Sequence, residues 1–306
     1  MYSVGFLIVS VAAILSCITQ IKRVFVESFV IGLFLLVGLA FFLQLMAAAR
    51  YERPDPPLSI AGVQMEFPSA GILPKILNRA LAKNPDAQIF VLSEYTLDGP
   101  VPDSLKNWCR EHSRFLIVGG KELLGSTNFH NTAFVVGTNG EVVFQQAKSV
   151  PIQFFKDGLP APEQKIWNSP WGKIGICICY DLSYTRVADR LVKQGAQLFI
   201  VPTMDVEEWG RHEHELHARV APVRAAEYGI PIFRLASSGI SQAVSGTGYV
   251  VAKTPFPGSL EMLSVKLRLP MCGSLPLDRY FAPVCVVITA IVTAALLFLA
   301  WRDKRR

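Results

Sequence analysis

The most pronounced feature of the sequence is three long apolar segments around a region of mixed character. Val4–Ile21 and Val24–Met46 follow each other near the N-terminus, and Phe281–Trp301 lies near the C-terminus. Each is close to the roughly 20 residues that an α-helix needs to cross the hydrocarbon core of a bilayer. The pattern predicts two transmembrane helices within 1–50, and a third followed by a basic tail within 281–306.

A cleaved signal peptide is the alternative interpretation of the first apolar segment. Signal peptides carry positive charge ahead of a short apolar core. Here no Lys or Arg precedes Val4, and a second long apolar segment follows at once. Both observations favour a transmembrane helix.

Between the apolar segments, short apolar runs alternate with amphipathic ones. The runs typical of strands are 58–66, 88–95, 115–122, 132–137, 141–146, 173–179, 197–202, 230–236 and 244–253. The runs typical of helices are 72–82, 102–112, 184–194 and 211–228. Buried strands that alternate with amphipathic helices indicate a layered α/β domain, which we expect over 51–255. The prolines that follow predict a linker over 256–280.

Charge and composition narrow the class of protein. With 51% hydrophobic and 18% charged residues, the chain is too apolar to be disordered. The formal net charge of +6 comes largely from residues that flank the apolar segments, including Lys22, Arg23 and the tail 302–306. The region 51–281 is nearly neutral, so we expect no nucleic-acid partner.

The same basic residues orient the chain in a membrane. Cytoplasmic segments next to transmembrane helices are rich in Lys and Arg. Lys22 and Arg23 lie between the first two predicted helices, and the basic tail follows the third. We therefore expect a multi-pass protein of the inner (cell) membrane whose globular domain lies on the periplasmic, extracytoplasmic side.

Cysteine and histidine spacing do not predict a metal centre. The six cysteines include no CxxC pair, the spacing that zinc sites commonly use. The run Arg211–His217 holds three histidines, but on a helix only His214 and His217 are three residues apart. The simpler interpretation is a polar helix start with His217 turned toward a site. We expect neither a metal nor another cofactor.

Three reactive side chains each lie at or just after the end of a predicted strand. Cys179 ends an apolar strand where a helix is about to begin, Glu94 follows four apolar strand residues, and Lys148 ends the hairpin strand. Each has a plainer alternative. Cys179 could be a buried structural cysteine, as we expect for Cys177; Glu94 could end its strand in water; and a lone lysine such as Lys148 is usually solvated.

Together the three residues form a complete set for acyl transfer. A carboxylate can take the thiol proton, the thiolate can attack a carbonyl carbon, and an ammonium group can stabilise the oxyanion. The backbone N–H of Tyr180 is the natural second oxyanion donor. Ser238 and Ser241 are the alternative nucleophiles, but neither lies in the Gly-x-Ser-x-Gly turn that serine hydrolases use.

In this combination the sequence resembles the nitrilase (carbon–nitrogen hydrolase) superfamily. Its signature is a Glu–Lys–Cys triad in this chain order, with the cysteine before Tyr and an acidic residue, here Cys179-Tyr180-Asp181. The resemblance covers about Leu58 to Lys253. It implies a four-layer αββα sandwich with Glu94, Lys148 and Cys179 as catalytic residues.

Within the superfamily the chain is most similar to the apolipoprotein N-acyltransferase branch. The stretches that match are Asn131–Phe134, Trp209-Gly210, His217–Glu227, and Arg234 followed by Ser238–Ser241. The resemblance implies that Trp209, His217 and Ser238 lie at the substrate side of the site. It also implies a phospholipid acyl donor and a lipoprotein or other amine acceptor.

Two departures from the family pattern stand out. A supporting Glu that the family carries after its lysine has no clear equivalent: Lys156 lies near that place, and Asp157 is the only nearby substitute. The acyltransferases also have more transmembrane helices than the three predicted here, which bears on the substrate more than on the chemistry.

These observations leave three functions in order of preference. The first is a membrane-anchored thiol acyltransferase that works through a thioester. The second is an anchored amidase of the same superfamily, which Asp181 in place of Glu and the smaller membrane part favour. The third is a catalytically silent membrane module that keeps the fold for binding, for which the Lys156 departure is the main support.

Overall fold

The computed structural model describes residues 31–34, 36–38, 41, 56–258, 260–303 and 305 of the 306-residue chain. The chain divides into two compact units, one of Arg50–Ser274 and one of Met1–Ala49 together with Leu275–Arg306. The predicted segment Val4–Ile21 lies outside the described residues, and Val24–Met46 is described only in part.

The unit that contains both termini includes the helix α8 (Asp278–Asp303). This helix spans the apolar segment Phe281–Trp301, the third of the predicted transmembrane helices. Across the described residues, we find no helix with both the length and the apolar character needed to cross a bilayer. The three transmembrane helices stay predictions.

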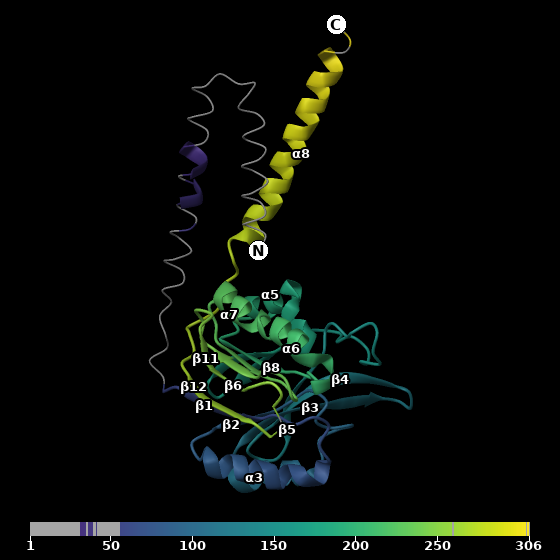
Figure 1. Ribbon diagram of the computed structural model, residues 1–306, viewed down its shortest axis with the longest axis vertical. Helices are drawn as coiled ribbons and strands as arrows, with labels where there is room; N and C mark the ends of the chain where they lie inside the picture. Colours follow the sequence, from purple (N-terminus) through teal and green to yellow (C-terminus); the bar gives the residue numbers. More distant parts are fainter. Residues whose placement is uncertain are drawn as a thin grey trace. The chain divides into compact units, whose positions relative to one another are not determined.

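The unit Arg50–Ser274 is built on two six-stranded sheets (Figure 1). The first has the order β12-β1-β2-β3-β4-β5, and its strands are β1 (Leu58–Val63), β2 (Ile89–Leu92), β3 (Phe115–Leu124), β4 (Asn128–Val136), β5 (Val142–Ala147) and β12 (Met262–Leu267). β1, β2 and β3 are parallel, whereas the other neighbours pair antiparallel.

The second sheet has the order β11-β10-β9-β8-β7-β6. Its strands are β6 (Ile166–Ser169), β7 (Gly172–Ile176), β8 (Leu198–Pro202), β9 (Ile232–Leu235), β10 (Gln242–Val244) and β11 (Val250–Lys253). β7, β8 and β9 form its parallel centre. Side chains that follow β2, β7 and β8 therefore emerge at the carboxyl ends of parallel strands, where α/β sheets bind ligands.

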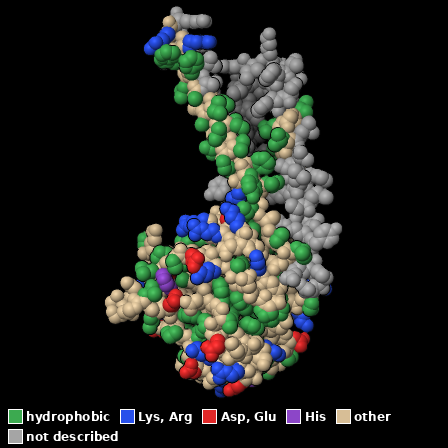
Figure 2. All heavy atoms as spheres, turned by 180° about the vertical axis from the view of Figure 1, so that it is seen from behind, with side chains coloured by type: hydrophobic (Ala, Val, Ile, Leu, Met, Phe, Trp, Pro, Cys, Tyr) green, Lys and Arg blue, Asp and Glu red, His purple; other side chains and the backbone are tan. Residues whose placement is uncertain are grey.

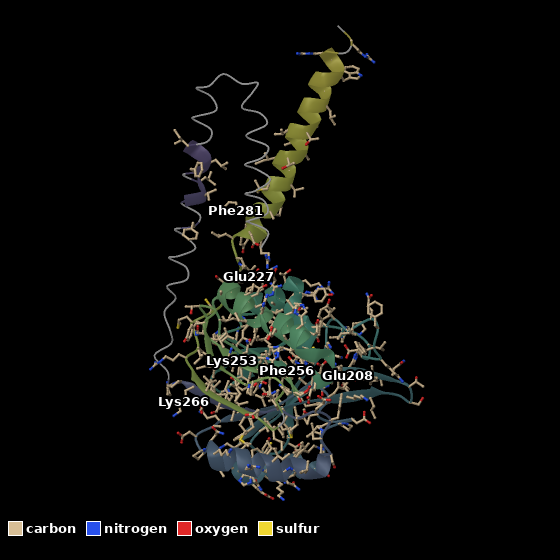
Figure 3. All side chains as sticks on the ribbon, in the orientation of Figure 1. Glu208, Glu227, Lys253, Phe256, Lys266 and Phe281 are labelled. Atoms are coloured by element: carbon tan, nitrogen blue, oxygen red, sulfur yellow. The ribbon has the colours of Figure 1, made fainter. Side chains whose placement is uncertain are left out.

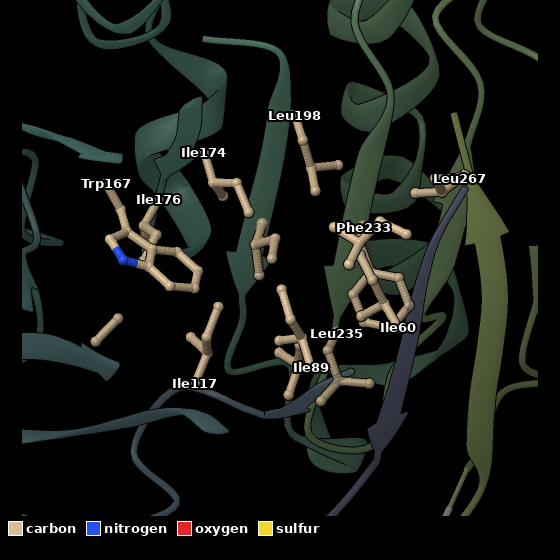
Figure 4. Packing of buried hydrophobic residues seen from close by; sticks show 14 of the residues in the cluster. Ile60, Ile89, Ile117, Trp167, Ile174, Ile176, Leu198, Phe233, Leu235 and Leu267 are labelled. Carbon is tan, nitrogen blue, oxygen red and sulfur yellow. The ribbon is translucent and has the colours of Figure 1, made fainter. Parts of the chain in front are cut away.

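The main hydrophobic core lies between the two sheets. Ile60, Ile89 and Ile117 of the first sheet belong to it and are fully buried. Figure 4 shows them opposite side chains of the second sheet such as Leu198 and Phe233. Stacked sheets bury side chains in this way over a thickness of about 10 Å. The core thus holds the two sheets face to face.

Helices cover the outer face of each sheet. The first sheet is covered by α3 (Leu73–Lys83) and α4 (Asp103–His112), and the second by α5 (Thr185–Lys193), α6 (Gly210–Ala218) and α7 (Val220–Tyr228) (Figure 1). The buried Leu73, Leu77 and Ala80 recur along α3 at helical spacing, so one face of this helix packs on the sheet. The unit is therefore a four-layer αββα sandwich, as expected.

Four details differ from the elements expected from the sequence. The expected helix 211–228 is interrupted at Arg219, and the expected strand 244–253 is two strands, β10 and β11. The segment 256–280, for which prolines predict a linker, contributes β12, whose alternating apolar residues pair with β1. The strand β6 has no apolar run to signal it and pairs only with β7.

The surface of this unit carries both signs of charge. On the face that Figure 2 shows, Lys and Arg side chains are interspersed with Asp, Glu and hydrophobic side chains. This distribution agrees with the near-neutral composition of residues 51–281.

Candidate active site

Glu94 lies two residues beyond β2 and is 2% exposed. One carboxylate oxygen accepts hydrogen bonds from Asn131 Nδ2 (2.6 Å) and Lys148 Nζ (2.8 Å). The other accepts from the backbone N–H of Met204 (2.7 Å). A buried carboxylate is costly without partners, and here both oxygens have them. The alternative in which Glu94 ends its strand in water is therefore wrong.

Lys148 follows β5 and is buried, with 1% of its surface exposed. Its Nζ lies 2.8 Å from Glu94 and 2.7 Å from Asp157 Oδ2. Burial alone would lower the pKa of this ammonium group, but the charges of Glu94 and Asp157 raise the pKa above its ordinary value. Lys148 is therefore a fixed positive charge between two carboxylates, and the solvated alternative is wrong.

Asp157 is the second carboxylate that contacts Lys148. Its Oδ1 accepts hydrogen bonds from Tyr95 Oη (2.6 Å) and Asn131 Nδ2 (2.7 Å), and its Oδ2 accepts from the backbone N–H of Ile152 (2.8 Å). Burial works to raise the pKa of Asp157, but Lys148 and these hydrogen bonds hold it below its ordinary value.

The neighbouring Lys156 is exposed. The carboxylate that the sequence lacks at the family position is thus supplied by Asp157. This removes the main observation that supported a catalytically silent module.

Cys179 begins a short 3-10 helix, Cys179–Ser183, three residues beyond the end of the second-sheet strand β7. It has a left-handed backbone (φ +49°) and is 2% exposed. A non-glycine residue in this region is strained, a feature that concentrates at functional sites. The thiol lies 3.8 Å from the backbone carbonyl of Met204, to which it donates.

The backbone of Met204 therefore links the thiol to Glu94, since its carbonyl contacts one and its N–H the other. Burial and the charge of Glu94 raise the pKa of Cys179 well above its ordinary value, and Lys148 opposes them. At rest the group is a protonated thiol, so it needs a base before it can attack a carbonyl.

Asp181 connects the cysteine turn to the segment that follows Lys148. Its carboxylate accepts hydrogen bonds from the backbone N–H groups of Ser149 (3.0 Å), Val150 (2.8 Å) and Ile178 (3.2 Å). Burial raises the pKa of Asp181 to about 6, although these hydrogen bonds act to lower it. Asp181 thus links the segment that follows β5 of the first sheet to the turn that carries Cys179 in the second.

A second buried ionic cluster lies beside the thiol. Asp205 follows β8, and its carboxylate contacts His217 Nδ1 (2.7 Å) and the guanidinium of Arg234. Arg234 also donates to the carbonyl of Ile240 at 2.6 Å. Burial works to raise the pKa of Asp205, but Arg234 and His217 hold it far below its ordinary value.

This cluster contains the one set of potential metal ligands in the described part of the chain. Ligand atoms of Cys179, Asp205 and His217 lie within 4.8 Å of one another. Both oxygens of Asp205 are already engaged, one by His217 and one by Arg234. A metal ion would have to displace a buried guanidinium of the same charge sign, so the cluster does not fit a metal. His214 instead packs on Phe256 and hydrogen-bonds the Val206 carbonyl.

The remaining predicted site residues are distributed around this centre. Ser238 is buried, and its hydroxyl lies within hydrogen-bonding distance of two acceptors, the backbone carbonyl of Asp205 (2.9 Å) and the carboxylate of Glu66. Trp209 stacks at a tilt on Phe155, with ring centroids 6.2 Å apart. The half-exposed Tyr180 places its ring against Tyr184. Its side chain thus packs outside the Glu94–Lys148 cluster, while its backbone follows Cys179.

A cavity of about 440 Å³ adjoins the site and includes Tyr95, Asp157 and Met204 in its wall. Much of the remaining wall is apolar, from Phe67, Pro68, Leu97, Ile152 and Phe155. Asp98, Lys121 and Lys156 add charge to it. Phe154, which precedes Phe155 in the chain, is 93% exposed. Apolar side chains therefore make up much of the surface beside the polar centre.

Two important residues were not predicted as site residues from the sequence. Asn131 joins Glu94 to Asp157, and Asp205 anchors the cluster next to the thiol. Asp205 did carry a signal, because it is a charged residue just past a buried strand end, as Glu94 is. Asn131 lies inside β4 and gave none beyond its place in a matching stretch.

Comparison with known proteins identifies the family that the chain resembles. A family model described as carbon–nitrogen hydrolase matches residues 56–276. The structure of Nit3 from Saccharomyces cerevisiae, described as a member of branch 10 of the nitrilase superfamily, superposes with a TM-score of 0.62 at 19% identity. The match covers 70% of this chain and 91% of that one. The two share a fold.

Relatives by sequence fall into two functional groups. An apolipoprotein N-acyltransferase from Geobacter metallireducens is 29% identical over 202 residues, which are 63% of this chain and 36% of that protein. A deaminated glutathione amidase from Dictyostelium discoideum is 25% identical over 179 residues, which are 51% of this chain and 62% of that protein. The chain spans less than two thirds of the length of either relative.

Proposed function

The chain belongs to the carbon–nitrogen hydrolase family, and on this premise we propose that it is a membrane-anchored thiol acyltransferase. The donor we propose is a phospholipid acyl ester, and the acceptor is the amine of a lipoprotein or a similar amine. The observation that carries the chemistry is the buried Glu94–Lys148–Asp157 set, which joins Cys179 through the backbone of Met204.

In the first half-reaction Glu94 removes the proton of the Cys179 thiol, and the sulfur forms a bond to the ester carbonyl carbon. Lys148 and the backbone N–H of Tyr180 stabilise the oxyanion that develops on the carbonyl oxygen. The carbon–oxygen bond of the ester then breaks, and Glu94 returns its proton to the departing alkoxide. The products are a thioester on Cys179 and a free alcohol.

In the second half-reaction an amine attacks the thioester carbonyl. Its nitrogen forms the new bond to carbon and gives up a proton to Glu94, and the carbon–sulfur bond breaks. The proton then returns to the sulfur of Cys179. Because Lys148 lies between two carboxylates, it stays a cation through both half-reactions and needs no change of charge.

Three features support a lipid donor. The cavity beside Tyr95 and Asp157 has a largely apolar wall. Exposed aromatic side chains, Phe154 among them, lie on the loop that forms part of it. An apolar surface of this kind favours burial of an acyl chain, at about 0.8 kcal/mol per methylene. One relative is described as an apolipoprotein N-acyltransferase.

An assay with defined substrates tests this proposal. The full chain, purified in detergent, is incubated with a phospholipid labelled in one acyl chain and with a diacylated lipopeptide that has a free amino terminus. We expect the label on the lipopeptide amine, and a thioester at Cys179 when the lipopeptide is left out. If the label is released only as free fatty acid, with or without the lipopeptide, the transferase proposal is wrong.

The second candidate is an amidase, which discharges the thioester to water. A relative described as a deaminated glutathione amidase favours it, and Lys121 and Lys156 in the cavity wall offer charge for a polar substrate. The same assay distinguishes the two functions when a small polar amide replaces the phospholipid. Hydrolysis of the amide, together with no use of the lipid, would favour the amidase.

We also propose that apolar segments anchor the chain with its globular unit on the extracytoplasmic side. The support is the sequence: three apolar segments and the basic residues beside them. Cys272 is an exposed free thiol in that unit, whereas Cys109, Cys177 and Cys179 are buried. A membrane-impermeant maleimide should therefore label Cys272 in intact spheroplasts, and a Cys272→Ser variant should lose that label. Labelling only after lysis would contradict the proposed orientation.

A further inference from the structure

A second cavity, of about 600 Å³, lies on the side of the second sheet that α6 and α7 cover. Its wall includes Gln242 of β10 and Lys253 of β11, which are direct partners in the sheet. Arg211 and Arg219 complete it from the helical layer, together with Phe256 from the segment after β11. Figure 3 labels Lys253 and Phe256. None of Glu94, Lys148 and Cys179 lines this cavity.

The wall carries an excess of positive charge. Arg211, Arg219 and Lys253 face one acidic residue, Glu215. Arg211 has partners: it lies 3.7 Å from Glu215 and donates to the carbonyl of Phe256 at 3.1 Å. In the described part of the chain, the side chains of Arg219 and Lys253 make no hydrogen bond or ion pair with another residue. Two cations are thus available for a negatively charged ligand.

The break between α6 and α7 is part of this arrangement. Arg219 is the residue that ends α6 and precedes α7. It is exposed, whereas its neighbours Ala218 and Ala221 are buried against the sheet. The interruption therefore leaves an exposed cation at the wall of the cavity.

A buried polar group points to a ligand independently of the charges. Gln242 is 6% exposed, and its Oε1 has no hydrogen-bond partner among the described residues. An unsatisfied buried carbonyl group destabilises the folded protein unless a ligand or solvent molecule donates to it. A hydroxyl group both donates and accepts hydrogen bonds, so it would satisfy either end of the Gln242 carboxamide.

We propose that this cavity is a second binding site, separate from the candidate active site, for a phosphate ester that also carries a free hydroxyl group. The phosphate would contact Arg219 and Lys253, with Arg211 held nearby by Glu215 and the Phe256 carbonyl. The hydroxyl would contact Gln242. Soluble glycerol phosphate and the headgroup of phosphatidylglycerol share this chemistry.

Binding measurements on the full chain in detergent test the proposal. Calorimetric titration with sn-glycerol 3-phosphate measures the soluble source, and retention of phosphatidylglycerol against phosphatidylcholine in native mass spectrometry measures the lipid source. Sulfate is the comparison anion, because it has the charge but no hydroxyl hydrogen. We expect saturable binding of glycerol 3-phosphate with a Kd of about 1 mM or tighter, or selective retention of phosphatidylglycerol. Either result supports the site and identifies the source.

Two variants locate the binding. The double variant Arg219→Gln/Lys253→Gln should weaken the binding of glycerol 3-phosphate and sulfate at least about tenfold, since charge-assisted hydrogen bonds are the strong ones. Gln242→Met should weaken glycerol 3-phosphate by about fivefold to tenfold and leave sulfate unchanged. Thermal unfolding of each variant shows that it is folded.

The matched control is Lys75→Gln/Lys83→Gln, which removes the same charge from exposed positions on α3, in the opposite helical layer. It should bind as the unchanged chain does. The proposal is overturned if neither phosphate ester binds. It is equally overturned if the control pair weakens binding as much as the cavity pair, or if Gln242→Met affects sulfate and glycerol 3-phosphate alike.

Discussion

Replacing Asp157 by asparagine tests whether this carboxylate supports Lys148. The new side chain can still accept from Tyr95 and Asn131 through Oδ1. Its amide nitrogen, however, faces Lys148 Nζ and the backbone N–H of Ile152, which are both donors. Asp157→Asn therefore removes one charge and two acceptor contacts while it keeps the size of the side chain.

The size of the effect follows from the burial of the pair. Lys148 and Asp157 have side-chain exposures of 1% and 4%, and removal of one partner of a buried ion pair costs about 3–5 kcal/mol. Lys148 keeps Glu94 as a partner, so we expect a loss near the lower end, about 3 kcal/mol of unfolding free energy. A misplaced oxyanion-stabilising group costs about 10²–10³ in kcat, and KM should change little.

The dependence on pH gives a further check. The folded-state pKa of Asp157 is lowered, so its contribution to stability is present above the ordinary value of about 3.9 and is lost as pH falls through the lower folded value. The free energies of unfolding of the parent protein and of Asp157→Asn, measured in urea, should therefore differ most at pH 7. The difference should become smaller below about pH 4.

The control for this substitution is Asp86→Asn, which removes a carboxylate from an exposed ion pair with Lys266. It should leave kcat unchanged. If Asp157→Asn keeps kcat within about threefold and unfolds like the parent protein, Asp157 does not support Lys148, and the reasoning from their contact fails.

Three further predictions address other parts of the site. Cys179→Ala should lower activity by about 10³-fold or more and abolish the trapped thioester in mass spectrometry, whereas Cys109→Ala should keep both; an active Cys179→Ala protein would refute thiol catalysis. Arg234→Met should lower the unfolding free energy by about 3–5 kcal/mol, measured in urea, because it leaves the Asp205 carboxylate short of its cation; unchanged stability would show that the pair is not structural. The pKa of Asp181 is raised to about 6 in the folded protein, so the folded state binds more protons than the unfolded chain between about pH 4 and 6, and this group's contribution should make the protein more stable as pH falls through that range. Asp181→Asn should remove that part of the pH dependence, and an identical pH profile would contradict the assignment.

The layered α/β fold was predictable because its central strands are short, continuous apolar runs. β2 and β8 are buried at every position, and such runs are visible in a sequence. The strands at the edges of the sheets were harder to predict from the sequence. β12 alternates between buried and exposed residues and is flanked by prolines, so the local composition favoured a linker over a strand that only long-range pairing with β1 defines.

The site was predictable to the extent that its residues follow strand ends. Glu94 and Lys148 meet as expected, although they are 54 residues apart in the chain. Whether Asp157 supports Lys148 could not be decided, because Lys156 lies near the family position and only the path of the loop buries Asp157 and exposes Lys156. The role of Asn131 was hidden for a similar reason: a polar residue inside a strand reveals its partners only when the sheets are packed.

The candidate active site is divided between the two sheets of the sandwich. Glu94 and Lys148 follow strands of one sheet, Cys179 follows a strand of the other, and the crossing contacts include those made by Met204 and Asp181. The distance between nucleophile and base is thus set by how the two sheets pack on each other. Loops at the edge of the site can then change in sequence and accept new substrates while the catalytic residues stay in place. A cavity in the core between the sheets, by contrast, would shift nucleophile and base relative to each other and lower the rate.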